Sequence, residues 1–295
     1  MTLKTYPVSI VVASHKGVNS LPIFIRSIYK SSFIPSEIII CCTNKKDVSK
    51  VVDPANLVKV VISPRANQVT QRLLALNHVS NEIVIQTDDD VTFQKNTIEL
   101  FFKKITNSEN DCIFGANCEL SNSKDSHRLA SLYEGNALVR FVINLLNSFK
   151  EVKSFSLLKS GRVISRLPCD KNKNIFDTEW LDSIICYRKE ILNISNFLPS
   201  VGKSYFEDVF FSHNLYLKGF KLLVISNAKY SESQNIRVGY KEYLHTIEWQ
   251  YFIVRKFNLN YLLFVLDIVL TQVFYLRLYL VKLVLRIFKL NSKPR

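Results

Sequence analysis

The sequence predicts an α/β protein in which a mostly parallel central sheet is covered by helices. Two observations support this fold class. Short, nearly continuous apolar runs such as residues 8–13 are typical of strands buried on both faces, and they alternate with segments whose apolar residues recur at helical spacing. With 295 residues, of which 47% are hydrophobic, the chain can bury the core of one large domain or of two small ones.

The first half of the chain supplies most of the predicted elements. We expect strands at residues 8–13, 38–42, 58–62, 82–87 and 112–116, and helices at residues 21–29, 69–78 and 98–105. The first helix carries start signals, because Ser20 precedes it and Pro22 lies in its first turn.

The pattern between residues 121 and 174 is more ambiguous, with a helix expected at residues 138–149 and a polar, lysine-rich loop at residues 171–174. A further strand is expected at residues 222–225. The sequence thus predicts an α/β domain over residues 1–238 and a helical region over residues 239–295.

Three consecutive carboxylates, Asp88-Asp89-Asp90, follow the apolar run of residues 83–85. Like charges repel, so three carboxylates at the end of a buried strand are costly unless a cation or a group of donors lies there. In open α/β sheets, ligands bind outside the carboxyl ends of the strands. The triplet therefore indicates a site, with a divalent metal as the first candidate ligand and a solvated turn as the alternative.

Composition limits the classes of function. The six cysteines form no CxxC pair, and the N-terminus lacks the apolar stretch of a signal peptide, so we expect reduced thiols in a cytoplasmic protein. All seven glycines are isolated, which disfavours dinucleotide-binding and P-loop enzymes. The net charge of +14 implies anionic partners. No nucleic-acid module is recognisable, and cations interleave with apolar runs after Arg255, so a membrane surface is favoured over nucleic acid.

Several short motifs occur in one order along residues 6–230. They are the opening strand Val8 to Ser14, the segment Leu21-Pro22 through Arg26-Ser27-Ile28, the strand Glu37 to Ile40, Gln71-Arg72 ahead of Asp88-Asp89-Asp90-Val91, Trp180-Leu181, Tyr187-Arg188-Lys189-Glu190, and Glu207-Asp208-Val209 followed by Gly219-Phe220-Lys221. In this order and spacing the chain resembles a family 2 glycosyltransferase of the nucleotide-sugar-dependent A-type fold.

The resemblance implies specific roles. Asp90 would bind a divalent cation, Mg or Mn, directly, Asp89 would assist it, and Asp88 would face the ribose or base and belong to the same metal site. The rest of the donor, a nucleoside-diphosphate sugar, would contact Ala13, Ser14, His15, Lys16 and Arg72. Asp208 would be the general base for the acceptor hydroxyl, with Glu207 as its neighbour. Such a metal neutralises the departing diphosphate, and such a base deprotonates the acceptor. The alternative for Glu207-Asp208 is a helix start whose acids favour the helix dipole.

Two departures from the family pattern bear on activity. Many relatives have an Asp near the uracil where this chain has Cys42-Thr43-Asn44, so the donor base is left open. Many also have a metal-binding His where this chain has Tyr230-Ser231-Glu232. In one alternative, Glu232 replaces that His as an oxygen ligand of the metal. In the other, the site binds the metal more weakly and the chain is an inactive homologue.

The C-terminal segment, residues 259–290, is strongly apolar but contains a polar arc that includes Asp267, Thr271, Lys282, Arg286 and Lys289. A spanning helix would carry Asp267 near mid-bilayer at about 2.5 to 3.5 kcal/mol. An in-plane helix keeps the polar face wet, so we expect an interfacial membrane anchor, with residues 243–257 as its lead-in. A transmembrane span and an ordinary packed helix pair are the alternatives.

The resemblance and the anchor together predict the function. We expect residues 1–238 to form a metal-dependent, inverting glycosyltransferase domain at the cytoplasmic face of a membrane. Its acceptor would be a glycan or a lipid-linked molecule, in bacterial surface polysaccharide synthesis. The alternatives are a non-catalytic nucleotide-sugar-binding membrane subunit and a sugar-nucleotide nucleotidyltransferase, although the latter class has a glycine-rich phosphate loop and residues 13–20 contain only Gly17.

Overall fold

The computed structural model describes residues 4–118, 137–150, 152, 154–164, 174–192, 196–197, 206–232 and 240–273. The chain forms two compact units. Unit 1 comprises residues 1–132, 153–156 and 165–237, and unit 2 comprises residues 133–152, 157–164 and 238–295.

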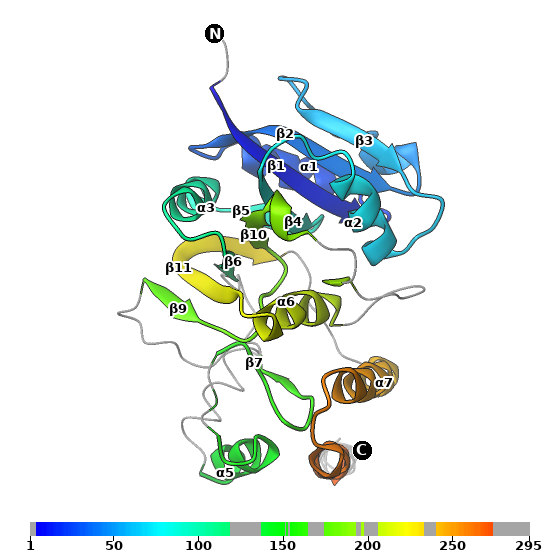
Figure 1. The fold of residues 1–295 in the computed structure, drawn as a ribbon. Coiled ribbons are helices and arrows are strands. Elements are labelled where there is room, and N and C mark those ends of the chain that lie inside the picture. The colour runs from blue at the N-terminus through cyan, green and yellow to red at the C-terminus, as the bar shows by residue number, and fades with distance from the viewer. Residues whose placement is uncertain are drawn as a thin grey trace, which may run out of the picture. The chain divides into compact units, whose positions relative to one another are not determined.

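The centre of unit 1 is a nine-stranded sheet in the order β3-β2-β1-β4-β10-β6-β11-β5, with β9 paired to β11 (Figure 1). Its strands are β1 (Thr5–Ser14), β2 (Ile34–Cys42), β3 (Val58–Ile62), β4 (Ile83–Asp88), β5 (Val91–Phe93), β6 (Cys112–Cys118), β9 (Ile175–Asp177), β10 (Ile185–Arg188) and β11 (Lys221–Glu232). The helices of this unit are α1 (Leu21–Tyr29), α2 (Gln68–Leu76), α3 (Thr97–Thr106) and α6 (Glu207–Leu217), with short 3-10 turns η1 (Lys45–Val48) and η2 (Lys189–Ile191).

The sheet is mixed, and its parallel part carries the N-terminal half. Strands β3, β2, β1 and β4 run parallel, as predicted from their apolar runs. β10 pairs antiparallel with β4 on one side and β6 on the other, while β5 and β9 pair antiparallel with β11. The prediction of a mostly parallel sheet covered by helices is thus confirmed, although the sequence did not indicate the antiparallel strands.

Burial on both faces explains the apolar strands. Val8, Ile10 and Val12 of β1 point to the face that α1 and α3 cover, where they pack with residues such as Phe24 and Phe101. Fully burying a side chain of this size stabilises the fold by about 1.5 to 3 kcal/mol. Val11 lies on the opposite face and is also buried, because α2 packs against β1 and β2 there.

A buried carboxylate ties the amino ends of the parallel strands together. Glu37 of β2 lies opposite Ser9 of β1, and the Ser9 hydroxyl donates to its Oε1 at 2.5 Å. The backbone N–H of Ser80 donates to the same oxygen at 2.6 Å, and Lys59 of β3 pairs with Oε2. Burial opposes ionisation of Glu37, but these hydrogen bonds outweigh it and lower its pKa to about 2. Glu37, one of the residues that carry the resemblance, is therefore a structural side chain.

Unit 2 contains α5 (Ala137–Leu146), part of the β7–β8 hairpin (Ser156–Leu157 and Val163–Ile164), α7 (Tyr240–Lys256) and a helix at residues 261–273. The expected helix at residues 138–149 is confirmed but ends at Leu146. Of the C-terminal segment, residues 274–290 lie outside the described part, as does most of the loop expected at residues 171–174. Among the residues that the structure describes, no helix is both long enough and apolar enough to cross a bilayer.

The helix at residues 261–273 corrects one expectation. Its polar side was expected to face water, but Asp267 is 1% exposed and forms an ion pair with Arg162 in the hairpin loop. Helical periodicity correctly placed Asp267 and Thr271 on one face, since both contact Arg162, while Lys282, Arg286 and Lys289 lie outside the described residues. It could not show that a residue 105 positions away covers that face.

Candidate active site

The candidate site is built on the carboxyl ends of three neighbouring parallel strands. The register of β1 places Ala13 opposite Cys41 of β2 on one side and opposite Asp88 of β4 on the other. Ser14 is the last residue of β1, and Asp89 and Asp90 follow directly after β4. The structure thus brings the predicted donor-binding residues Ala13 and Ser14 to the edge that carries the Asp triplet, as the order of the strands implied.

The loop after β1 packs tightly against the triplet. The Ser14 hydroxyl donates a short hydrogen bond to Asp89, and burial is the main reason that the pKa of this carboxyl is raised. Gly17 makes the packing possible, because a Cβ at this position would lie 2.7 Å from the Asp89 carboxylate. His15 and Lys16 are exposed in the same loop, with His15 Nδ1 3.4 Å from the Thr43 hydroxyl and Lys16 in the left-handed region at φ 62°. Their contact with a donor stays a prediction.

Arg72 of α2 is the buried centre of the site. Its guanidinium forms ion pairs with Asp88 and with Glu207 of α6. Gln68, one turn earlier on α2, donates to the same oxygen of Asp88 at 2.8 Å. Arg72 therefore fixes the first carboxylate of the triplet and connects it to Glu207. Arg72 Nε and Glu207 Oε2 have no hydrogen-bond partner among the described residues.

Asp208 has the electrostatics of a general base. It lies in the first turn of α6, after Phe206 in the left-handed conformation at φ 58°, and it accepts a hydrogen bond from the Val209 N–H at 2.8 Å. Burial, reinforced by the negative charge of Asp182, raises the pKa of Asp208 to about 7. A carboxylate with a pKa near neutrality accepts a proton far more readily than an ordinary aspartate does.

Glu232, the residue predicted to replace a metal-binding His, lies at the same edge. It ends β11, opposite Val91 of β5, which directly follows Asp90. The Ser183 hydroxyl donates to Glu232 Oε1 at 2.9 Å. Burial is the largest cause that raises the pKa of Glu232 to about 7, followed by the charge of Asp182 and, further down, those of Asp90 and Asp88.

Asp182 is a member of the site that the sequence did not indicate. It is partly exposed, and its Oδ1 accepts the N–H of Ser183 at 2.9 Å. Its charge raises the pKa of both Asp208 and Glu232, so it lies near both. The available signal was its position directly after Trp180-Leu181, two residues that carry the resemblance, but a lone acid in a loop has no distinctive spacing.

The carboxylates supply oxygen ligands of the kind that Mg and Mn prefer. Asp88, Asp90, Asp182 and Glu232 concentrate negative charge at one edge of the sheet, and after burial the charges of the three aspartates contribute to the raised pKa of Glu232. These residues therefore fit a divalent cation. Within the described residues, however, no three acidic, His or Cys side chains already converge as ligands, so the metal site stays a prediction.

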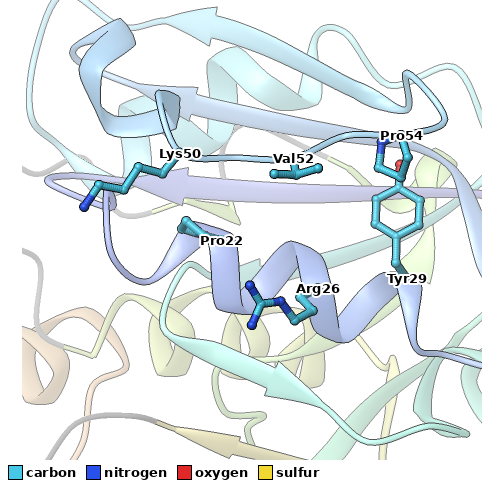
Figure 2. A pocket seen from close by; sticks show the side chains of 6 residues that line it. All are labelled: Pro22, Arg26, Tyr29, Lys50, Val52 and Pro54. Carbon is cyan, nitrogen blue, oxygen red and sulfur yellow. The ribbon is translucent and has the colours of Figure 1, made fainter.

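The surface of unit 1 also has a pocket of about 290 Å³ that is separate from this edge (Figure 2). It lies between α1 and the loop before β3 and is lined by Pro22, Arg26, Tyr29, Lys50, Val52 and Pro54. None of the predicted site residues lines it. We locate the candidate site at the strand edge, because the perturbed carboxylates lie there.

Comparison with known proteins agrees with the fold and with the family that the sequence resembles. The family model described as "Glycosyl transferase family 2" matches residues 9–157, which is half of the chain. No curated protein sequence gives a significant match.

Solved structures of glycosyltransferases have the same fold at low sequence identity. The chain is similar to TarS residues 1–349 of S. aureus, with a TM-score of 0.52 and 14% identity over 84% of this chain and 65% of that one. It is similar to GalNAc-T7 with UDP, GalNAc and Mn2+, with a TM-score of 0.54 and 14% identity over 84% and 48% of the two chains. It is also similar to the mannosyltransferase PcManGT of Pyrobaculum calidifontis in complex with GDP-Man and Mn2+, with a TM-score of 0.53 and 15% identity over 81% and 60%. The chain thus spans about half to two thirds of the length of these structures.

Proposed function

The chain belongs to glycosyl transferase family 2, and on this premise we propose that it is an inverting glycosyltransferase. It would move a sugar from a nucleoside-diphosphate sugar to a hydroxyl of a glycan or lipid-linked acceptor. The observation that carries the proposal is Asp208, a partly buried carboxylate with a pKa raised to about 7 at the edge where the Asp triplet lies.

The proposed reaction uses these residues. The acceptor oxygen forms a bond to the anomeric carbon, the bond from that carbon to the diphosphate breaks, and Asp208 takes the proton of the acceptor hydroxyl. A single displacement of this kind inverts the anomeric configuration. A general base typically contributes about 100-fold to 10,000-fold in rate. Glu207 would hold Arg72 beside Asp208 and would act through it as a positioning residue.

The leaving diphosphate needs compensation of its charge. We propose that Asp90, Asp88 and Glu232 hold a divalent cation, Mg or Mn, which supplies Lewis-acid stabilisation of the diphosphate when bound. Asp89 would support Asp90, and Asp88 would face the ribose. The two terminal nitrogens of Arg72 already compensate part of the negative charge of Asp88 and Glu207. The Nε–H of Arg72 has no partner among the described residues, so it is the group that would contact the donor.

We further propose that the reaction belongs to bacterial surface polysaccharide synthesis at the cytoplasmic face of the membrane. The support is the net charge of +14 together with the basic, apolar C-terminal sequence, which suits an anionic membrane surface that carries lipid-linked acceptors.

One observation favours a second function. By the family resemblance, Glu232 stands in place of a metal-binding His, and a weak metal site would leave a non-catalytic nucleotide-sugar-binding subunit. Incubating the purified chain with UDP-, GDP- and TDP-sugars and Mn distinguishes the two. We expect slow metal-dependent hydrolysis of one donor, which Asp208→Asn reduces. Metal-dependent binding of a donor with no hydrolysis and no transfer to any acceptor extract would favour the subunit instead.

A further inference from the structure

The helix at residues 261–273 turns its polar side into unit 2. Asp267 accepts hydrogen bonds from Arg162 Nε at 2.9 and 3.0 Å, from the Ser160 hydroxyl at 3.1 Å and from Gln250 of α7 at 2.9 Å. The Arg162 guanidinium also contacts Thr271, one turn further along the helix. We call these five residues the Asp267 cluster. A buried carboxylate with this many donors fixes the rotation of the helix about its axis.

The neighbouring backbone is shaped to receive this helix. Gly161 has a φ of +80°, and a Cβ there would collide with the Val254 side chain and lie 3.2 Å from Gln250 Cγ, so the hairpin loop packs closely on α7. At the start of the helix, the Asn260 N–H donates to the Lys159 carbonyl at 2.9 Å, and its side chain accepts the Leu263 N–H at 3.0 Å. The helix is thus held at its start and at its middle.

With the polar side held inward, an apolar stripe faces outward. Its residues are Leu262, Val265, Val269 and Val273, which are 78%, 41%, 52% and 60% exposed. They recur every three or four residues and therefore line one side of the helix. Tyr261, which is 57% exposed, extends the stripe at its start. Single exposed apolar residues are common, but a continuous stripe marks an interaction surface.

The charges around the stripe identify the partner. Exposed Arg255 and Lys256 end α7 next to the turn that leads into the helix, and the Arg255 guanidinium lies 5.9 Å from the Tyr251 ring centre. The 22 residues that follow the helix, 274–295, contain six Lys or Arg and no Asp or Glu. A second copy of the chain would bring a net charge of +14 against this surface, whereas anionic lipid headgroups complement it.

We propose that the stripe of Leu262, Val265, Val269 and Val273 enters the interfacial layer of an anionic bilayer, with the helix lying in the membrane plane and the Asp267 cluster turned away from the lipid. The apolar side faces the lipid, as in the anchor expected from the sequence, but the polar side packs inside unit 2 and does not face water. The inference relies on the proposed membrane location only for the identity of the partner, and it does not require glycosyl transfer.

Site-specific fluorescence on the full chain tests the proposal. An environment-sensitive fluorophore is attached through Val269→Cys, and in a matched variant through Val52→Cys, which is 75% exposed in unit 1. Both variants carry Cys169→Ser, because the other five cysteines are buried. With vesicles containing about 30 mol% phosphatidylglycerol, the label at 269 should shift to the blue and gain about twofold in intensity. The label at 52 should not change. Quenching by brominated lipid should likewise affect position 269 alone.

A second measurement tests the contribution of the apolar stripe separately from that of the basic residues in 274–295. The double variant Leu262→Glu/Val269→Glu should lose about tenfold or more in partition onto the same vesicles, whereas Val52→Glu should partition as the wild type does. The proposal is overturned by an unchanged label at 269 with lipid present, or by wild-type partition of the double variant. It is also overturned if light scattering finds a dimer without lipid that the double variant dissociates, because the stripe would then be a self-interface. Loss of transferase activity affects none of these readouts.

Discussion

Arg72 and Glu207 form a buried ion pair between α2 and the first turn of α6, although 135 residues separate them in the chain. The same guanidinium holds Asp88 at the end of β4. Arg72 therefore links Glu207, which precedes the candidate base Asp208, to Asp88, the first residue of the Asp triplet. The geometry of the candidate site depends on one arginine that is 1% exposed.

Removing this arginine should destabilise the fold strongly. Arg72→Met leaves Glu207 buried without its counter-charge, and breaking a buried ion pair by losing one partner typically costs about 3 to 5 kcal/mol. Lys103→Met is the matched control, because it removes the exposed Lys103–Glu99 pair of α3, and such helical pairs contribute about 0.3 to 0.5 kcal/mol. Urea unfolding of the two variants measures the difference. Equal free energies of unfolding would contradict a central role for Arg72.

Donor binding and transfer should separate at Asp208. Asp208→Asn keeps the shape of the side chain but cannot accept the acceptor's proton, so we expect unchanged affinity for the nucleotide and a loss of about 100-fold or more in transfer. Calorimetric titration of the nucleotide and a transfer assay give the two quantities. Transfer at the wild-type rate would assign the base to another carboxylate.

The rate should also depend on pH in a defined direction. Burial, with the charge of Asp182, raises the pKa of Asp208 to about 7. Below that pH Asp208 is protonated and cannot act as a base, so kcat/KM should rise with pH and level off above it.

The charge of Asp182 should influence the pH at which kcat/KM rises. Asp182→Asn removes a negative charge that raises the pKa of Asp208, so the rise should move to lower pH. Asp111→Asn, before β6 and away from the site, should leave the profile unchanged. A rise that stays in place in Asp182→Asn would exclude the electrostatic coupling.

Metal binding should depend on Asp90. Asp90→Ala should abolish the Mn-dependent part of nucleoside-diphosphate binding and leave the melting temperature within a few degrees of the wild type, because Asp90 is only partly buried beyond the end of β4. Titration of Mn with and without the nucleotide measures the dependence. Wild-type metal dependence in the variant would remove Asp90 from the metal site.

The sequence predicted the part of the fold that local pattern specifies. The strands around Ile10, Ile39 and Val84 are buried on both faces, and a continuous apolar run is the direct signature of such burial. The strand of Ile185–Arg188 was missed because four residues carry no periodicity, and its place between β4 and β6 is a property of the assembled sheet.

In the candidate site, too, local sequence pattern predicted some features, and contacts between distant segments decide the others. The Asp triplet was identified from its position at a strand end, whereas Asp182 and the pairing of Arg72 with Glu207 depend on contacts between distant segments. Asp267 gives the reverse case: its helical face was predicted, but water was expected where Arg162 lies. Periodicity assigns residues to a face and does not identify what covers that face.

The place of β10 in the sheet has a consequence for how the chain folds. β4 lies between β1 and β10, so its outer edge has no partner until residues 185–188 have been synthesised. From the synthesis of Ile83–Asp88 until that of Ile185–Arg188, the backbone N–H and C=O groups on this side of β4 form an open, apolar strand edge. Such edges recruit other strands, and pairings this distant in sequence form slowly. Domain assembly should therefore be a late, cooperative event, and the N-terminal half expressed alone should aggregate through the strand whose end carries the Asp triplet.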